Sequence, residues 1–527
     1  MIDRLPPGKV PWDLVARHVS GPLPGNVELG PGPGEDAALV RFGDALWAVA
    51  SDPISFTAEQ AGRLAVLVNA NDVAVAGARP ALFVAVLLVA PSEATPERID
   101  RLLAEIRAAC DELGVALIGG HTEVSPGLEH SVVVGTMLGP VEGRSLRTGG
   151  LAPGCRVSLA GWAGLEGSGV LLDEFGEALA GRIPAVELDA LRAALAEHGI
   201  SIVGPARAAA GVDGVVALHD VTEGGVGEAL YEMARASGVT IEARPEAIPV
   251  LPATRRIAGL LSIDPAGLLG SGALLVGHEP DAADALARVV GALGLPFAEI
   301  GAVTGPAPEG SVSGLRRFPR DEVLRALALR GAAAWVFDMD GTLVDSPYDW
   351  TAIRRRLDVR SPSIIDDIEQ RPEPGRTRAW QELRRIENHA TERATAMPGA
   401  RELLDLLRRH GVRTALVTNN SRENAEALLE RFDLRFDLVI TRDDGVWKPS
   451  PAPIERALDG LGVDPSRAVV VGDSRYDLEA GRTAGVRAVV ILGPPDGEAG
   501  RQADLCFPNL DALARHAELC LDEGNAR

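Results

Sequence analysis

The chain is poor in cysteine, and its few cysteines are far apart. Only four occur in 527 residues: Cys110, Cys155, Cys506 and Cys520. A disulfide framework or a zinc site needs cysteines, or cysteines and histidines, at short regular spacings, and this sequence has no such pattern. The spacing is typical of buried or incidental thiols in a reducing compartment.

Long apolar runs are also missing. No uninterrupted apolar stretch approaches the roughly 18 to 20 residues that a membrane-spanning helix requires, and Phe83–Ala90 is far too short. The first residues, MIDRLPPGKVPWDL, do not place an apolar core behind basic residues, as a signal peptide does. We therefore expect a cytoplasmic protein with no membrane partner.

An excess of basic charge is the third absence. The chain has 52 Lys and Arg against 74 Asp and Glu, which gives a formal net charge of −22. Nucleic acids are bound through an excess of Lys and Arg, so this balance argues against a nucleic-acid partner. It does not exclude nucleotides, which acidic proteins bind through Mg²⁺. The length predicts two to four domains.

The most explicit chemistry lies in residues 333–346, AAWVFDMDGTLVDS. The apolar run Ala333–Phe337 predicts a buried strand, and it ends in two carboxylates, Asp338 and Asp340, followed by Gly341. The carboxyl ends of strands form the ligand crevice of an open α/β sheet, so these acids are expected in an active site. One carboxylate can attack phosphorus, the other can protonate the leaving oxygen, and Mg²⁺ can screen their repulsion. An acidic surface turn is the alternative for this segment taken alone.

Three later segments supply matching groups. Ala415–Asn420 (ALVTNN) predicts a strand that ends in small polar residues, with Thr418 placed to hydrogen-bond a phosphate oxygen. Lys448, in the sequence WKP, can neutralise the nucleophile and the phosphoryl oxygens. A third strand, within Val469–Asp477 (VVVGDSRYD), delivers Asp473 with Asp477 four residues further on.

These four elements, in this order, resemble the haloacid dehalogenase (HAD) superfamily of phosphotransferases over about residues 333–520. The resemblance implies a Rossmann-like domain in which Asp338 forms an aspartyl-phosphate and Asp340 is the general acid, later the base that activates water. It also implies that Thr418 binds phosphate and that Lys448 balances charge. The implied Mg²⁺-site residues are Asp338, Asp340, Asp473 and Asp477.

The segment that follows the first motif, residues 346–397, is predicted to be mostly helical, for example over Tyr348–Leu357 and Thr377–Thr395. It resembles the small helical cap of the HAD superfamily, which closes over the substrate and sets specificity. The cap arginines, Arg354 to Arg356, Arg384 and Arg385, could meet a second anionic group of the substrate. A solvated helix face is the alternative, and the more common one.

Residues up to about 325 have a different composition, rich in glycine and in short apolar runs. Strands are expected at Ala45–Ala50, Leu82–Leu88, Ser131–Leu138, Val157–Ala160 and Gly272–Val276. Helical patterns lie between them, at Arg63–Ala76, Pro96–Leu113 and Glu223–Ser237. The Pro- and Gly-rich stretch Gly305–Gly314, followed by a helix around Arg320–Arg330, predicts the end of this part. The predicted domains are residues 1–150, 151–310 and 333–520, with a linker at 311–332.

Five acidic or glycine-rich segments recur in this part. They are Gly34–Ala38, Ser51–Pro53, Asn69 with Asn71 and Asp72 at the start of a helix, Gly119–Glu123, and His219–Val226. We interpret each as a strand end or helix start that aims carboxylates or backbone N–H groups into one crevice. Such a crevice could bind a polyphosphate through Mg²⁺ ions, with the glycines allowing close approach of the backbone.

All five segments, in order, resemble the superfamily of aminoimidazole ribonucleotide (AIR) synthetase, thiamine-monophosphate kinase, selenophosphate synthetase and the carbamoyl-dehydrating hydrogenase maturation factor. The resemblance covers about residues 5–310. It implies a PurM-like N-terminal half that forms a β-barrel with a second copy, an α+β C-terminal half, and bound ATP. The implied metal residues are Asp36, Asp52 and Asp72. The implied nucleotide-binding residues are Asp36, Asp72, Gly119, Gly120, Glu123, Asp220, Thr222, Gly224 and Gly225, with Lys9 as a further candidate.

The branch of this superfamily decides which reaction is expected. The segments 219–230 (HDVTEGGVGEAL) and 269–277 (LGSGALLVG) resemble the hydrogenase-maturation branch, which works through a cysteine at the end of the domain. This domain ends without one, which argues against cyanide-ligand synthesis, and no cysteine precedes Cys110, which argues against selenophosphate synthesis. An ATP-dependent activation or phosphorylation of a small molecule remains.

The sequence thus predicts a multidomain protein of α/β and α+β class with two possible organisations of function. In the first, a Mg²⁺-dependent, phosphoglycolate phosphatase-like phosphomonoesterase of a small phosphorylated metabolite is fused to an ATP-dependent kinase or synthetase that handles a related small molecule. In the second, only the HAD part is catalytic, and the N-terminal part is a nucleotide-binding module for regulation and dimerisation. A homodimer through the N-terminal part is expected in either case.

Overall fold

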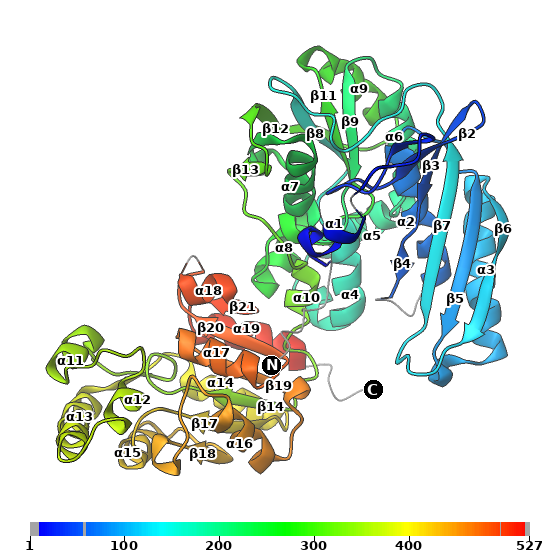
Figure 1. The fold of residues 1–527 in the computed structure, drawn as a ribbon. Coiled ribbons are helices and arrows are strands. Elements are labelled where there is room, and N and C mark those ends of the chain that lie inside the picture. The colour runs from blue at the N-terminus through cyan, green and yellow to red at the C-terminus, as the bar shows by residue number, and fades with distance from the viewer. Residues whose placement is uncertain (1–9, 20, 56–59, 496, 522–527) are drawn as a thin grey trace. The chain divides into compact units, whose positions relative to one another are not determined.

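The computed structural model describes residues 10–19, 21–55, 60–495 and 497–521 (Figure 1). The chain forms two compact units, Met1–Gly259 with Ile263–Val323, and Leu260–Ser262 with Leu324–Arg527. Lys9 lies outside the described residues. No helix in the described part of the chain has both the length and the apolar composition of a membrane span.

The first sheet of the first unit has the strand order β1-β2-β3-β7-β5-β6, and β4 pairs with β7. Its strands are β1 (Val27–Leu29), β2 (Ala38–Phe42), β3 (Ala45–Ala50), β4 (Pro53–Ile54), β5 (Leu82–Val89), β6 (Ala116–Val124) and β7 (Val132–Pro140). Buried and partly buried residues alternate along β5 and β7, because one face of each strand packs on the core. Helices α2 (Ala61–Val75) and α3 (Pro96–Leu113) supply that core together with the sheet.

The second sheet of this unit has the order β13-β10-β12-β8-β11-β9. Its strands are β8 (Arg156–Ala160), β9 (Val215–Asp220), β10 (Val239–Ala243), β11 (Leu274–His278), β12 (Phe297–Pro306) and β13 (Ser311–Ser313). The helices of this half are α4 (Leu165–Ala180), α5 (Ala185–His198), α6 (Val203–Ala210), α7 (Gly225–Ser237), α8 (Pro252–Leu261) and α9 (Ala283–Gly291), and α1 (Trp12–Val19) precedes the first sheet. Residues 311–332, predicted to be a linker, contain β13 and the short helix α10 (Glu322–Ala326).

Two local predictions for this unit are wrong. Gly119–Glu123 does not form a turn after a strand; all five residues lie within β6, which pairs in parallel with β5. Asn69, Asn71 and Asp72 do not open a helix but lie in the interior of α2. In both places the long-range packing of the element outweighs the local preference of Gly and Asn for turns and helix ends.

The second unit contains a parallel sheet with the order β18-β17-β14-β19-β20-β21. Its strands are β14 (Ala334–Phe337), β17 (Arg413–Val417), β18 (Leu438–Ile440), β19 (Ala468–Gly472), β20 (Ala488–Leu492) and β21 (Leu505–Phe507). The surrounding helices are α14 (Ala400–Arg409), α15 (Arg422–Phe432), α16 (Ala452–Leu461), α17 (Arg475–Thr483), α18 (Glu498–Gln502) and α19 (Leu510–Leu521). Every residue of β14 and β19 is buried, as expected for strands covered on both faces.

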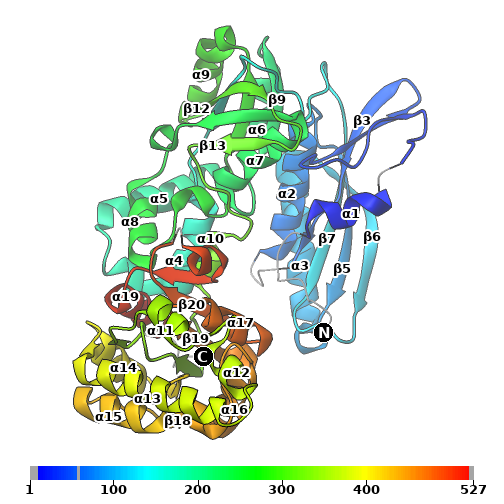
Figure 2. The ribbon, with the colours of Figure 1, turned by 60° about the vertical axis from the view of Figure 1, so that its left-hand side comes forward.

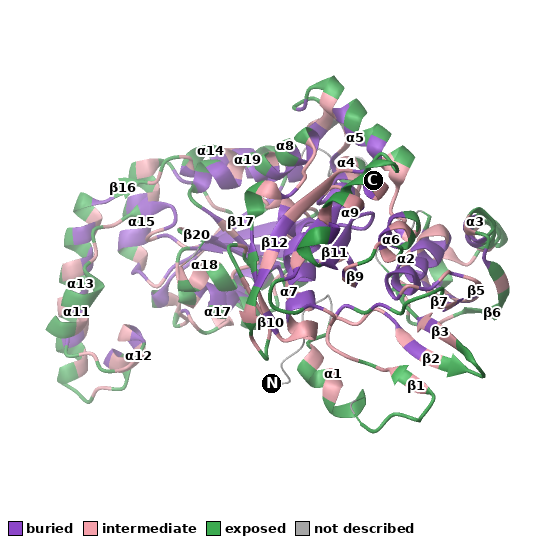
Figure 3. Cartoon of the chain, turned by 90° about the horizontal axis from the view of Figure 1, so that it is seen from above, coloured by how far each residue is buried: buried purple, intermediate pink, exposed green. Residues whose placement is uncertain are grey.

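Three helices form a separate layer in this unit (Figure 1): α11 (Trp350–Arg356), α12 (Ile364–Glu369) and α13 (Gly375–Arg393). Figure 2 shows this layer from the front, drawn over the rest of the unit. The three helices share a small apolar core that includes Ile353, Ile368 and Leu383. The strands β15 (Val344–Asp345) and β16 (Thr395–Ala396) pair with each other where the chain enters and leaves this layer. Figure 3 shows buried and exposed positions alternating along α13. The sequence prediction of a helical cap corresponds to this layer.

Candidate functional site

The carboxyl ends of three neighbouring strands meet at one edge of the parallel sheet of the second unit. β14 lies between β17 and β19, and the residues that follow these strands are Asp338, Thr418 and Asp473. Parallel strands all end at the same edge, where open α/β sheets bind their ligands. The three sequence segments therefore deliver their polar residues to a common place.

Asp338, Asp473 and Asp477 form an acidic cluster there. One carboxylate oxygen from each lies within 4.8 Å of the other two. The buried Lys448 donates hydrogen bonds to Asp338 Oδ1 and to Asp477 Oδ1, each at 2.5 Å. Burial disfavours the charged lysine, but Asp338 and Asp477 outweigh this effect and raise the pKa of Lys448.

The cluster fits a divalent cation. If all three carboxylates were ionised, Lys448 would leave two negative charges uncompensated. Burial raises the pKa of Asp338 well above its usual value, Asp477 and Asp473 add to the effect and Lys448 opposes it, so a divalent cation would favour the ionised form. Carboxylate oxygens are the ligands that Mg²⁺ prefers. Gly341, at φ +84°, allows Asp473 to approach the chain closely, because a Cβ at this position would lie 2.1 Å from Asp473 Oδ2.

Asp340 lies beside this cluster but bonds elsewhere. Its Oδ1 accepts a hydrogen bond from Ser346 Oγ at 2.6 Å, and its Oδ2 accepts one from Asn420 Nδ2 at 3.1 Å. Burial raises the pKa of the Asp340 carboxyl group, although both of these hydrogen bonds lower it. Thr418 is buried, and its Oγ1 accepts a hydrogen bond from the Asn420 N–H at 3.1 Å.

Sequence reasoning did not single out two asparagines that hold these groups in place. Asn419 Nδ2 donates to the Lys448 carbonyl at 2.9 Å, and Asn419 Oδ1 accepts from the Lys448 N–H at 2.8 Å. Asn420 contacts Asp340, as described, and its Nδ2 is 3.2 Å from the Tyr348 hydroxyl. Their position directly after a predicted strand was the available indication.

Two polar contacts tie the helical cap to the segment that follows β18 in the same unit. Arg442 Nη2 donates to Glu387 Oε2 of α13 at 2.6 Å, and both residues are buried. Trp447 Nε1 donates to Asp366 Oδ1 of α12 at 2.7 Å. Trp447 precedes Lys448, so the cap is anchored next to the lysine of the site.

Most of the cap arginines that were considered for a second anion have structural partners. Arg354 Nη1 donates to the Pro362 carbonyl at 2.8 Å. Arg356 and Arg385 form ion pairs with Glu382. Arg384 is exposed. The structure therefore gives Arg354, Arg356 and Arg385 roles within the cap.

The first unit contains a second acidic cluster, made by Asp36, His219 and Asp220, whose ligand atoms lie within 4.8 Å of one another. His219 Nδ1 is 2.7 Å from Asp36 Oδ2, and His219 Nε2 is 3.2 Å from Glu232 Oε2. Burial disfavours the charged imidazole, but Asp36 and Glu232 outweigh it and raise the pKa of His219 well above its usual value. His219 was not among the predicted site residues.

The glycine-rich turn beside this cluster links β9 to α7. Gly224 and Gly225 have φ values of +77° and +58°, which glycine adopts without strain. The Thr222 carbonyl accepts a hydrogen bond from the Gly225 N–H at 3.1 Å. Asp321, in the segment predicted to be a linker, stabilises this turn by accepting a hydrogen bond from the Gly224 N–H at 2.8 Å. Burial raises the pKa of Asp321 to about 7.

The other predicted residues of the first unit do not join the Asp36 cluster among the described residues. The Asp52 N–H donates to Asn69 Oδ1 at 2.8 Å, and Asp72 is buried within α2. Gly119 and Gly120 are paired in β6. Glu123 is exposed on the same strand and accepts a hydrogen bond from Ser125 Oγ at 2.6 Å. Within a single chain, the predicted common crevice is therefore not formed by all five segments.

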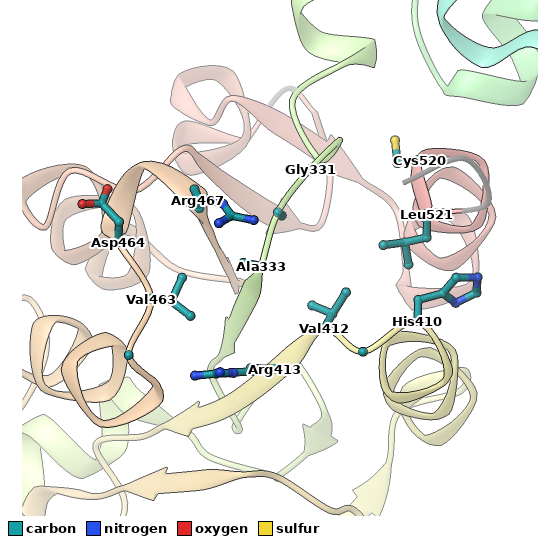
Figure 4. Close-up of a pocket in the computed structure, with 13 residues that line it drawn as sticks. Gly331, Ala333, His410, Val412, Arg413, Val463, Asp464, Arg467, Cys520 and Leu521 are labelled. Carbon is teal, nitrogen blue, oxygen red and sulfur yellow. The ribbon is translucent and has the colours of Figure 1, made fainter. Parts of the chain in front are cut away.

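A cavity of about 590 Å³ in the second unit (Figure 4) has no residue of the acidic cluster in its lining. It is lined by residues at the amino ends of the strands, among them Ala333, Arg413 and Arg467. The amino and carboxyl ends of parallel strands lie at opposite edges of a sheet, and ligands of such sheets bind at the carboxyl edge. The acidic cluster, and not this cavity, is therefore the candidate active site.

Three family models match the chain. The model for haloacid dehalogenase-like hydrolases matches residues 333–485, and those for the N-terminal and C-terminal domains of AIR synthase related proteins match residues 34–141 and 152–312.

Three similar proteins cover different parts of the chain. An uncharacterized hydrolase of Saccharomyces cerevisiae is 30% identical over 177 residues, which are 32% of this chain and 81% of that protein. A plasmid phosphoglycolate phosphatase of Cupriavidus necator is 31% identical over 209 residues, 34% of this chain and 90% of that protein. A putative hydrogenase expression/formation protein of Methanocaldococcus jannaschii is 28% identical over 258 residues, 47% of this chain and 73% of that protein.

These findings confirm the predicted family resemblances and the multidomain α/β fold class. The chain is a fusion of AIR synthase-related N-terminal and C-terminal domains with a C-terminal domain that belongs to the haloacid dehalogenase-like hydrolases.

Proposed function

We propose that the chain is a bifunctional protein in which the HAD domain, predicted to span residues 333–520, is a Mg²⁺-dependent phosphomonoesterase. The observation that supports this most directly is the contact of Lys448 with both Asp338 and Asp477 inside a three-carboxylate cluster. In this proposal Asp338 is the nucleophile, Lys448 balances its charge, and the three carboxylates together form the metal site. Such a cluster would hold Mg²⁺ through Asp338, Asp473 and Asp477 and would thereby neutralise the phosphoryl oxygens.

In this proposal the reaction has two steps. Asp338 attacks phosphorus, a carboxylate oxygen–phosphorus bond forms, the ester P–O bond breaks, and Asp340 gives its proton to the leaving oxygen. Asp340 then accepts a proton from water, the water oxygen bonds to phosphorus, and the bond to Asp338 breaks to release phosphate. Lys448 and Thr418 hold the phosphoryl oxygens. The buried position of Asp340 supports the first role, because burial favours the protonated acid.

The substrate class follows from similarity and from the cap. The relative from Cupriavidus necator is named a phosphoglycolate phosphatase, and it matches this chain over 90% of its own length. A small phosphorylated metabolite is therefore the substrate class of the proposal, with the leaving group enclosed by the helices α11 to α13. The cytoplasmic location stays a prediction from the sequence.

For the N-terminal part we propose ATP as substrate or ligand, bound with Mg²⁺. The Asp36–His219–Asp220 cluster lies at the carboxyl end of β9, next to the turn formed by Gly224 and Gly225. Backbone N–H groups in such a turn suit phosphate oxygens, and carboxylates suit their metal ions. The function that we favour for the N-terminal part is a kinase or synthetase activity. The alternative is a nucleotide-binding module for regulation and dimerisation.

Strand β6 supports the proposed homodimer. It is the last strand in the order of its sheet, and eight of its nine residues are exposed while the ninth, Leu117, is partly exposed. Ile118 is 55% exposed and Val124 is 51% exposed. An edge strand with unpaired backbone groups and apolar side chains is suited to pairing with a second chain. Glu123, Gly119 and Gly120 would then lie at the interface between the two copies.

Removing the metal is the first test of the HAD assignment. We expect the protein to release phosphate from phosphoglycolate or another small phosphomonoester only with Mg²⁺ present. EDTA should lower the rate by at least about 100-fold, because two uncompensated charges would then repel the phosphoryl group. Released phosphate is measured before and after the addition of excess Mg²⁺. Full activity in EDTA would contradict the metal site.

Asp220→Ala tests the nucleotide site of the first unit. We expect ATP to bind roughly tenfold or more weakly, since a carboxylate that holds the nucleotide's metal ion is lost. Hydrolysis of a small phosphoester by the HAD domain should be unchanged. Binding is measured by calorimetry with Mg²⁺, and Asp281→Ala, an exposed acid of the same unit, is the matched control.

An unchanged ATP affinity in Asp220→Ala would remove this residue from the site. The two readings of the N-terminal part differ in turnover. ADP formation that depends on added cell metabolites, with the phosphatase silenced, supports the kinase or synthetase. A phosphatase rate that changes with ATP, without such ADP formation, supports the regulatory module.

A further inference from the structure

Trp350 is an exposed residue at the start of the first cap helix. It begins helix α11 directly after the N-cap residue Asp349, and 52% of its surface is accessible. The other large apolar side chains that the described residues expose to this degree all lie at or before Leu293, outside the HAD domain. A single exposed apolar side chain is ordinary on a protein surface, so the inference rests on what Trp350 contacts and not on its exposure alone.

The Trp350 ring is held against a second aromatic ring. Its centroid lies 4.7 Å from that of Tyr348, and the two ring planes are inclined by 27°. This is a stacked pair, which fixes the orientation of the indole. The stack with the partly buried Tyr348 holds the indole in place while half of Trp350 stays exposed.

The ring pair is connected to the general acid of the proposed reaction. Asn420 Nδ2 lies 3.2 Å from the Tyr348 hydroxyl and donates at 3.1 Å to Asp340 Oδ2. Asp340 gives its proton to the leaving oxygen in the proposed mechanism, so the leaving group lies on the Asp340 side of the phosphorus. The Tyr348 hydroxyl is on this side of the site, and Trp350 is next to it through the ring stack.

Most of the cationic side chains that could bind a leaving group near Tyr348 and Trp350 already form ion pairs with acidic residues. Arg442 is paired with Glu387, Arg356 and Arg385 are paired with Glu382, and Lys448 is paired with the acidic cluster. A carboxylate on the leaving group would have to compete with these acids. Arg355 of α11 and Arg384 of α13 are exposed cap arginines that could still meet such a carboxylate.

We propose that the Tyr348–Trp350 ring pair binds a planar, aromatic leaving group, so that the substrate class of the HAD domain is a phosphomonoester of an alcohol carried by an aromatic ring. This rests on the phosphomonoesterase function proposed above and specifies its substrate. The bond changes are those of the two-step hydrolysis, and the aromatic alcohol leaves with the proton from Asp340. Trp350 acts on specificity and takes no part in the bond changes.

The experiment compares three primary alkyl esters that differ in the leaving group and not in the type of ester: benzyl phosphate, cyclohexylmethyl phosphate and phosphoglycolate. The kcat/KM of each is measured for the wild-type chain, Trp350→Leu, Trp350→Phe and Arg384→Gln. We expect the wild type to prefer benzyl over cyclohexylmethyl phosphate by about three- to tenfold, the effect of one ring stack. Trp350→Leu should remove this preference, mainly through KM, and Trp350→Phe should keep most of it.

Three results would overturn the proposal. They are an equal loss for all three esters in Trp350→Leu, no loss for any of them, or a strong wild-type preference for phosphoglycolate over benzyl phosphate, whether or not Arg384→Gln abolishes it. The last result would assign a second anion-binding group in place of the aromatic surface. Circular dichroism of each variant separates a folding defect from a change of specificity.

A second measurement separates this proposal from the proposed hydrolysis itself. Binding of benzyl and cyclohexylmethyl phosphate to the Asp338→Asn chain is measured by calorimetry, with and without the Trp350→Leu change. A Trp350-dependent preference for the benzyl ester supports the aromatic surface even if the wild-type chain releases no phosphate. Equal binding of the two esters contradicts it, whatever the activity of the wild type.

Discussion

Replacing Asp338 by Asn lowers phosphate release by at least about 10³-fold in the presence of Mg²⁺. An amide is a poor nucleophile, so the aspartyl-phosphate does not form, and it is a weaker ligand for a hard cation than a carboxylate. The change is nearly isosteric, and it removes one of the two carboxylates that contact Lys448. Released phosphate is measured over a range of substrate concentrations to obtain kcat and KM separately.

The matched control for this variant is Asp405→Asn, which changes a carboxylate of α14 in the same unit whose side chain is 45% exposed. Its activity should equal that of the wild type. If Asp338→Asn retained a tenth of the wild-type turnover or more, another group would have to attack phosphorus, and the HAD mechanism would be wrong for this chain. A normal circular dichroism spectrum of Asp338→Asn excludes loss of the fold as the cause.

Replacing Arg442 by Met destabilises the HAD domain by about 3 to 5 kcal/mol, because Glu387 is left buried without its ionic partner. Both side chains are buried, with 4% and 7% of their surfaces exposed. Arg442 also lies over the ring of Trp380, 4.9 Å from its centroid. The unfolding of this domain is followed by hydrogen exchange of α13 and by calorimetry of the full chain.

The double variant Arg442→Met, Glu387→Leu should recover most of this loss, since it removes both charges from the interior. Arg408→Met, which breaks an exposed pair with Asp405, is the control and should cost less than about 1 kcal/mol. If Arg442→Met lowered the free energy of unfolding no more than Arg408→Met does, the Arg442–Glu387 pair would not stabilise the attachment of the cap. If the double variant were as unstable as the single one, packing against Trp380 would be the larger contribution.

In the HAD domain, local sequence patterns were sufficient to predict which polar residues follow the central strands. The apolar runs before Asp338, Thr418 and Asp473 form β14, β17 and β19, and these strands are neighbours in one parallel sheet. A short apolar run that ends in a polar residue is a local property, and parallel strands all end at one edge. The positions of these three residues could therefore be predicted without knowledge of the tertiary structure.

The same kind of reasoning failed for Gly119–Glu123 and for Asn69 to Asp72. Glycine and asparagine favour turns, but β6 continues through both glycines. Gly120 lies so close to β5 that a Cβ there would be 1.8 Å from the Ala85 carbonyl oxygen. The glycine serves the close approach of two strands, which a reading of local preferences cannot distinguish from a turn.

The sequence by itself determined the order of the elements, the family of each part and the residues that stand at the strand ends. Only the tertiary structure decided which side chains meet: Asp36 with His219, 183 residues apart, Glu387 with Arg442, 55 apart, and Gly224 with Asp321, 97 apart. Hydrophobic periodicity and turn residues act within a few neighbouring positions, so they specify elements. Hydrogen bonds and ion pairs between distant residues depend on how whole elements pack, and that packing is fixed only when the complete core is buried.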